Sequence, residues 1–200
     1  MNNEKRKNLT LKIVLAAIFT AIVFVLQFFV GSNIRLFGVF TISATLIPIV
    51  VGAALCGDLV GAWLGLVFGF VVLISGDAAP FLAFNPAATV LTVLIKGAAA
   101  GFVAGLIFRL LEKKNRTLAV FASAVAAPVV NTGIFLIACF LFFMEPVSAW
   151  ATGAGYSNAV AYVFIGMAGI NFIAELVFNV VLCPVILRII DAARKSISKQ

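Results

Sequence analysis

The sequence predicts an all-α integral membrane protein, a compact bundle of six transmembrane helices with both termini in the cytoplasm. Of its 200 residues, 64% are hydrophobic and 10% are charged, which is far more apolar than a soluble globular domain. Its aromatic residues are mostly Phe, which suits side chains that face hydrocarbon and need no hydrogen-bond partner. The lipid bilayer is therefore the expected solvent, and residues 1–200 are expected to form a single transmembrane domain.

A helix needs roughly 20 mostly apolar residues to cross a bilayer, and the sequence offers six such stretches. The first is longer than the apolar core of a signal peptide, so a retained helix is expected. Little more than Gly57-Asp58 separates the second and third, which predicts a tight helical hairpin. Pro48, Pro128 and Pro184 are expected to kink their helices without breaking them. The predicted spans are about 11–30, 37–56, 59–76, 86–111, 117–144 and 160–190.

The positions of Lys and Arg predict the orientation, because cytoplasmic flanks collect these residues. Twelve of the 14 fall on one side of the predicted spans, and an even span count places both termini on that side. The net charge of +7 therefore indicates membrane topology and not nucleic-acid binding. The twelve are Lys5, Arg6, Lys7, Lys12, Arg109, Lys113, Lys114, Arg116, Arg188, Arg194, Lys195 and Lys199.

Three predicted outward connections, 31–36, 77–85 and 145–159, are longer and more polar than the inward ones. Contacts with a ligand from outside would gather there, and Trp150 and Tyr156 in the last connection are candidates. The alternative is that these are only solvated loops, with Trp and Tyr as anchors at the membrane interface.

Small residues recur on three of the predicted helices. Gly57, Gly61, Gly65 and Gly69 repeat every four residues, as do Gly97, Gly101 and Gly105, and such patterns let helix backbones approach closely in lipid. A tight bundle is the expected result. Ala17 and Ala21 on the first helix form a further small-residue patch, which suits either packing within the chain or docking of a separate membrane subunit.

Polar residues inside the predicted spans are the strongest candidates for a site, because an ionisable group at mid-membrane costs roughly 2.5–3.5 kcal/mol unless it is paired or hydrated. Helical periodicity places Lys96 on one face with Asn85, Thr89 and Thr92. Glu175 has Asn171 and Asn179 four residues to either side, and Asn131 adds an amide in the fifth span. Either these residues line a ligand pocket, or Lys96 and Glu175 form an ion pair that locks the bundle.

Asn85-Pro86 predicts the N-cap and first residue of the fourth helix, whose positive end would then face the outer side. With Lys96 and Arg35 nearby, this would favour an anionic group on the ligand, such as a carboxylate. Arg35 has an alternative role, which is contact with lipid headgroups.

No phosphate-binding loop, nucleophile elbow, zinc-protease motif or dinucleotide-binding glycine pattern occurs in the sequence. The chain has no His, and its three Cys lie in apolar stretches without a close pair, so buried thiols are expected instead of a disulfide or metal site. No enzymatic activity, cofactor or metal is expected.

Several stretches together resemble the substrate-binding S components of energy-coupling factor (ECF) vitamin transporters, in the branch that includes folate, pantothenate and cobalamin proteins. The resemblance covers essentially the whole chain. It lies in Ala17–Ala21, Thr45-Leu46-Ile47-Pro48, Asn85-Pro86, Lys96-Gly97, Pro128-Val129-Val130-Asn131-Thr132-Gly133 and Asn171-Phe172-Ile173-Ala174-Glu175.

This resemblance implies a subunit of a bacterial plasma membrane that binds a water-soluble vitamin with high affinity on its outer side. It implies assembly with a membrane scaffold subunit, which would contact Ala17 and Ala21, and with two ATPase subunits. Pantothenate is slightly favoured, because it suits a small pocket with a buried cation, while folate and cobalamin stay open. The alternative function is an autonomous ion- or proton-coupled carrier with Glu175 as the titrating group, which predicts transport by this chain alone.

Overall fold

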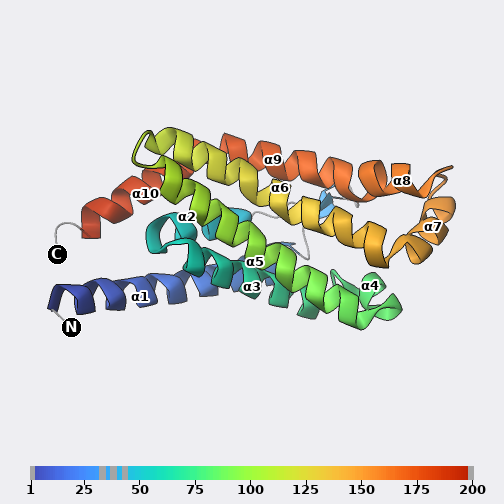
Figure 1. Cartoon of the computed structure of the whole chain (residues 1–200), viewed down its shortest axis with the longest axis horizontal. Coiled ribbons are helices and arrows are strands. Elements are labelled where there is room, and N and C mark those ends of the chain that lie inside the picture. The colour runs from blue at the N-terminus through green and yellow to red at the C-terminus, as the bar shows by residue number, and fades with distance from the viewer. Residues whose placement is uncertain (1–2, 32–34, 37–39, 42–44, 198–200) are drawn as a thin grey trace.

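The computed structural model describes residues 3–31, 35–36, 40–41 and 45–197, and nearly all of these are helical. The long helices run side by side along one axis (Figure 1). In chain order the elements are α1 (Asn3–Val25), the π-helical η1 (Leu26–Gly31), β1 (Arg35–Leu36), β2 (Phe40–Thr41), α2 (Leu46–Cys56), α3 (Asp58–Ile74), α4 (Ala79–Phe84), α5 (Pro86–Leu111), α6 (Arg116–Phe142), α7 (Met144–Gly153), α8 (Ala159–Ala161), the π-helical η2 (Tyr162–Gly169), α9 (Ile170–Val181) and α10 (Cys183–Ile197).

Four helical stretches among the described residues are long and apolar enough to cross a membrane. Two shorter apolar helices, α2 and α3, accompany them. The all-helical membrane class is therefore confirmed, while the count of six spans stays a prediction. The four stretches are Leu9–Phe29, Pro86–Leu111, Arg116–Phe142 and Ala159–Val181.

The predicted second span is wrong as a continuous helix over 37–56. The helix begins only at Leu46, and β1 and β2 form a small antiparallel pair before it. The sequence between 36 and 42 is rich in Phe, Val, Thr and Ile, which favour strands over helices. With 11 residues, α2 is about 16 Å long, whereas the hydrocarbon core is about 30 Å thick.

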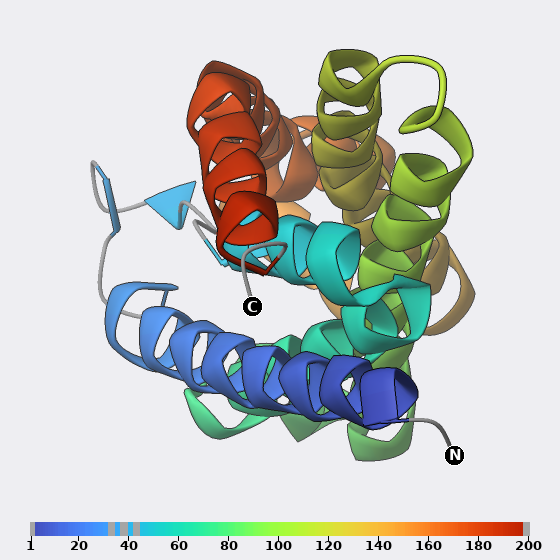
Figure 2. The same ribbon diagram turned by 90° about the vertical axis from the view of Figure 1, so that its left-hand side faces the viewer.

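Helix α2 forms the centre of the bundle. Seen from the end where α1 begins, it lies between α1 and the longer helices (Figure 2). Leu46, Ile49 and Val50 on it are almost fully buried, because neighbouring helices cover it on every side. The predicted tight hairpin to α3 is confirmed: α2 ends at Cys56, α3 begins at Asp58, and Gly57 between them has a φ of 106° that favours glycine.

Two predicted loops contain short helices. The 77–85 connection holds α4, and the 145–159 connection holds most of α7. Pro128 lies within the continuous helix α6, as predicted, whereas Pro48 lies in the first turn of α2, because that helix begins only at Leu46. Near Pro184, however, the helix is divided at Leu182, because proline has no N–H to continue the hydrogen-bond ladder. The predicted sixth span, 160–190, is therefore a chain of α8, η2, α9 and part of α10.

Glycines join α3 and α5 in the most extensive helix contact of the described structure. Gly61 lies against Gly101, and Gly65 lies against Gly97, with backbone facing backbone. A Cβ atom added at any of these four positions would overlap the carbonyl oxygen of its partner. The tight packing that the glycine spacing predicts is therefore confirmed for this pair.

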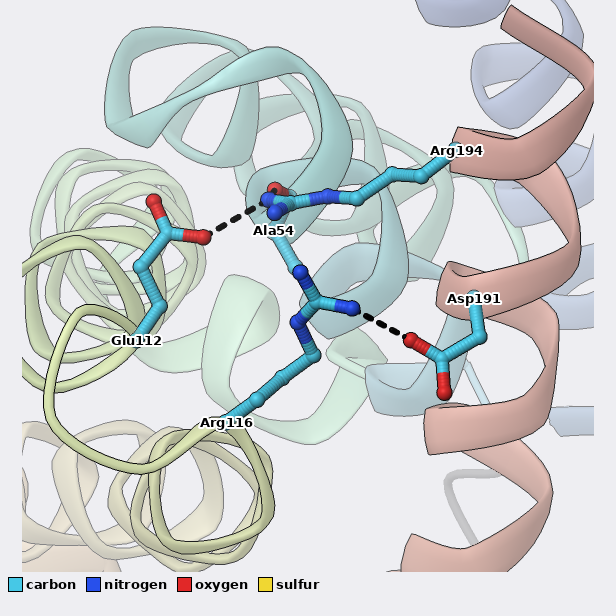
Figure 3. Close-up of polar contacts among 5 residues, drawn as sticks. All are labelled: Ala54, Glu112, Arg116, Asp191 and Arg194. Carbon is cyan, nitrogen blue, oxygen red and sulfur yellow. Dashed lines mark hydrogen bonds and ion pairs between the residues drawn. The ribbon is translucent and has the colours of Figure 1, made fainter. Parts of the chain in front are cut away.

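Ion pairs hold the opposite end of the bundle from α4 and α7. Arg194 of α10 donates to Glu112 at 2.7 Å and to the carbonyl oxygen of Ala54 at 3.3 Å, and Arg116 of α6 pairs with Asp191 (Figure 3). Asp58 and Arg109 form a third pair at 2.9 Å, between α3 and α5. The start of α1 and the end of α10 lie at this same end (Figure 1). Its location on the cytoplasmic side stays a prediction from the Lys and Arg pattern.

Replacing Gly65 with Ala is expected to lower the free energy of unfolding by about 1–3 kcal/mol or more, because the new methyl group would overlap backbone atoms that cannot rotate away. Thermal unfolding in detergent measures the effect. Gly133→Ala in α6 is the matched control, since a Cβ there meets nothing within 4 Å and Ala favours the helix. Equal melting temperatures for the two variants would contradict the tight α3–α5 contact.

Candidate ligand-binding site

A cavity of about 570 Å³ lies inside the bundle, toward the end that carries α4 and α7. Its size falls in the range of small-molecule sites, which is roughly 300–1,000 Å³. Its wall comes from segments far apart in the sequence, namely η1, α3, the turn before α4, α4, α5, α6, η2 and α9. The cavity therefore exists only in the folded bundle.

Six of the ten predicted site residues line this cavity. The face of α5 that periodicity predicted contributes Thr89, Thr92 and Lys96. Asn131 reaches it from α6, and α9 adds Asn171 and Glu175. The polar faces of α5, α6 and α9 therefore meet at this cavity.

Three of the other predicted residues, Asn85, Trp150 and Tyr156, are not among the described lining residues. Asn85 caps α5, as predicted, by accepting a hydrogen bond from the N–H of Ala88 at 3.1 Å. Trp150 packs edge-on against Phe81, and Tyr156 packs against Tyr162. The side chain of Arg35 lies outside the described part of the structure, so its contact with a ligand stays a prediction.

Lys96 lies over the face of an aromatic ring. Its Nζ atom is 5.5 Å from the centroid of Phe135, a distance at which a cation is attracted to the ring. Glu175 and Asp77 are the carboxylates whose charges act on this ammonium group. Lys96 is in none of the three ion pairs given above for the described residues, and both alternatives for Lys96 and Glu175, ligand binding and an ion pair, stay predictions.

Buried atoms of three amide side chains have no hydrogen-bond partner among the described residues. The Oδ1 atoms of Asn131 and Asn171 are unpartnered, although both residues line the cavity. Asn179, only 1% exposed, has neither amide atom bonded and lies outside the cavity wall. Buried polar groups are usually hydrogen-bonded, so unpartnered atoms at a cavity suit a site that a ligand or water completes.

Aromatic side chains close the end of the cavity near α4. Phe81 of α4 makes edge-to-face contacts with Phe135, Phe143 and Trp150 at centroid distances of 5.7, 5.0 and 5.3 Å. Phe81, Phe135 and Phe143 line the cavity, and Trp150 lies behind Phe81. Trp150 therefore supports the wall indirectly, because it fixes a ring that faces the cavity.

A polar network on the α3 side of the cavity was missed by the sequence reasoning. Gln27 and Asp77 both line the cavity, and Gln27 donates to Asp77 at 3.2 Å. Buried Thr45 donates to Gln27, and Ser75 donates to Asp77. Gln27 inside the first apolar span was the available signal, since a buried amide in lipid needs partners.

A family model described as "ECF transporter, substrate-specific component" matches residues 11–187. The chain belongs to this family. The match spans all the helices that line the cavity, and it confirms the resemblance found in the sequence. No curated protein and no solved structure matches the chain.

As an S component, the protein is a membrane-embedded substrate-binding subunit of a transporter and works with other ECF subunits. Its three cysteines are free; Cys56 and Cys139 are buried, and Cys183 is half-buried. Among the described residues, no group of three or more His, Cys, Asp or Glu side chains is placed to hold a metal ion.

Replacing Asn131 with Leu is expected to stabilise the ligand-free S component by about 1–3 kcal/mol, because it removes an amide that is 7% exposed and has an unpartnered oxygen. Asn115→Leu is the control of opposite sign: it deletes the cap of α6, which accepts from the N–H of Leu118 at 3.0 Å. Melting temperatures in detergent distinguish the two. A lower value for Asn131→Leu would show that this amide is already satisfied in the ligand-free protein.

Proposed function

We propose that this S component binds a water-soluble vitamin or related micronutrient with high affinity, as the recognition subunit of an ECF importer of a bacterial plasma membrane. The observation that carries the proposal is the convergence of the polar faces of α5, α6 and α9 on one cavity inside an otherwise apolar bundle. Polar groups are costly at this depth, so their convergence on one space suits substrate binding.

In this site Lys96 donates hydrogen bonds to an acceptor on the ligand, such as a carboxylate, a carbonyl oxygen or a ring nitrogen. Asn131, Asn171 and Glu175 hydrogen-bond its remaining polar groups, and Thr89 and Thr92 border it. Arg35 is proposed as a further contact from the outer side. Asn85 and Trp150 act indirectly, because one begins α5 and the other supports Phe81.

The proposed orientation places the cavity on the outer side and both termini in the cytoplasm. The cavity lies toward α4 and α7, whereas the start of α1 and the end of α10 lie at the opposite end (Figure 1). A ligand from outside would then enter at the end closed by Phe81 and Phe143. Import requires energy from other chains, and we propose a membrane scaffold subunit with two ATPase subunits.

Helix α1 is the proposed docking surface for the scaffold subunit. It contains the least buried of the four candidate spans, and Ala17 and Ala21 lie on its exposed side. Its inner side is held within the chain, where Trp63 of α3 donates to Thr20 at 3.1 Å. Small exposed residues would let a partner helix approach α1 closely.

The proposed function is tested by calorimetry with the purified protein and a panel of water-soluble vitamins. At least one vitamin is expected to bind at submicromolar concentration, and Lys96→Met is expected to weaken it by about 1.5–3 kcal/mol, the scale of a hydrogen bond to a charged group. Lys113→Met, at an exposed position at the opposite end, should leave affinity unchanged. The function fails if no vitamin binds, and unchanged affinity of Lys96→Met would make that residue structural.

Replacing Ala17 and Ala21 with Trp is expected to abolish uptake and co-purification with the other ECF subunits while vitamin binding persists, because the bulky rings would hold the partner helix away. Ala87→Trp, at an exposed position of α5, is the control. Normal assembly of the α1 variant would show that the scaffold docks elsewhere.

A further inference from the structure

Asp77 is a carboxylate held in place at the cavity wall. Its Oδ2 atom accepts from the Ser75 hydroxyl at 2.9 Å and from the Gln27 side-chain amide at 3.2 Å. Gln27 is itself fixed, because its Oε1 atom accepts from the Thr45 hydroxyl at 2.9 Å. Gln27 and Thr45 are buried, so η1, the start of α2 and the end of α3 together set the position of one carboxylate.

The direction of these hydrogen bonds determines what Asp77 presents to the cavity. The Thr45 hydroxyl bonds the oxygen end of the Gln27 amide, and the NH₂ end therefore faces Asp77. Both bonds to the carboxylate use Oδ2, and no described residue donates to Oδ1. An ionised carboxylate accepts hydrogen bonds and donates none, so Asp77 can accept a hydrogen bond from a ligand.

Asn171 offers a second acceptor whose identity is fixed by its neighbours. Its Nδ2 atom donates to the carbonyl oxygen of Met167 at 3.4 Å, so the other amide atom must be the oxygen. That oxygen is buried and has no partner. A ligand that completes it must donate a hydrogen bond.

The charges of the described cavity wall also favour a donor. Asp77 and Glu175 carry two negative charges, and Lys96 carries one positive charge. A group with N–H donors or a positive charge suits the two acidic side chains, whereas a carboxylate on the ligand would have to lie near Lys96 or the proposed contact Arg35.

The apolar part of the wall suits a flat ring. Aromatic side chains from α3, α4, α6 and α9 face the cavity, and ring stacking and edge-to-face contacts favour planar ligands. These faces also attract cationic or electron-poor rings. The aromatic lining residues are Phe68, Phe81, Phe135, Phe143 and Phe172.

We propose that the ligand is an amino-substituted nitrogen heterocycle and that Asp77, held by Gln27 and Ser75, accepts hydrogen bonds from its amino or ring N–H groups. The inference rests on the proposed function and names the substrate class of the same cavity. It reverses the preference for pantothenate, because pantothenate has neither an amino group for Asp77 nor a ring for the aromatic part of the wall. Lys96 then bonds a ring nitrogen or carbonyl group of the ligand.

The first experiment compares two groups of vitamins by thermal shift and calorimetry with the full chain. Thiamine and folate carry an amino group on a nitrogen heterocycle, and pyridoxamine carries an aminomethyl group on a pyridine ring. The second group has no such amino group and consists of pantothenate, biotin, nicotinate, riboflavin and cobalamin. The tightest binder is expected in the first group. A tightest binder in the second group overturns this inference but leaves the proposed function standing. If neither group binds, the proposed function falls, and the inference falls with it.

The second experiment measures the affinity of Asp77→Asn for two compounds: the tightest binder, and its analogue in which an oxo or hydroxyl group replaces the amino group. If folate is the tightest binder, pterin and lumazine are the simpler pair. Asp77→Asn is expected to weaken the amino compound at least about tenfold and to reduce the preference over the analogue. A purely structural role would weaken both compounds equally, and that outcome overturns the assignment.

Glu145→Gln is the matched control, since Glu145 is an exposed acidic residue of α7 outside the cavity wall. Its affinity and its preference between the two compounds should equal those of the unmodified protein. Melting temperatures without ligand report whether Asp77→Asn is folded. If that variant is unfolded, Thr45→Val removes only the hydroxyl that orients Gln27, and the same loss of preference is expected from it.

Discussion

The backbone contact between α3 and α5 is the constraint on which the rest of the molecule depends. Gly65 and Gly97 face each other so closely that neither can carry a side chain. Lys96 directly precedes Gly97, and Phe68 lies one turn after Gly65, so the same contact positions a cation and an aromatic ring at the cavity wall. In lipid such close packing replaces the hydrophobic driving force that stabilises soluble cores.

The cavity concentrates polar groups that the bundle leaves partly unsatisfied. Asn131 and Asn171 each have an unpartnered oxygen, while Asp77 is fully oriented by Gln27 and Ser75. A side chain that is held in position before the ligand binds, and can still accept a hydrogen bond from it, is preorganised. Such a side chain loses little conformational entropy on binding. The same arrangement costs stability in the ligand-free state, as is common at functional sites.

The two ends of the bundle differ in how they are held. Ion pairs link α10 to the α5–α6 turn and to α6 at one end, with the Arg194 guanidinium also over the ring of Phe108. At the other end the short helices α4 and α7 meet through edge-to-face aromatic contacts of Phe81. The end at which we propose that a ligand enters is therefore held by aromatic packing.

The sequence by itself determined the membrane class, the close packing at the glycine repeats and the polar faces of α5, α6 and α9, because apolar length and helical periodicity are local properties. That the two glycine repeats face each other came from the structure. The sequence missed that residues 35–41 contain paired strands and that Gln27 joins Asp77, 50 residues away. It also placed Trp150 in a loop, although Trp150 belongs to α7 and packs against Phe81. Only the tertiary structure decided these points, since donor direction and the charge of a cavity depend on contacts between distant segments.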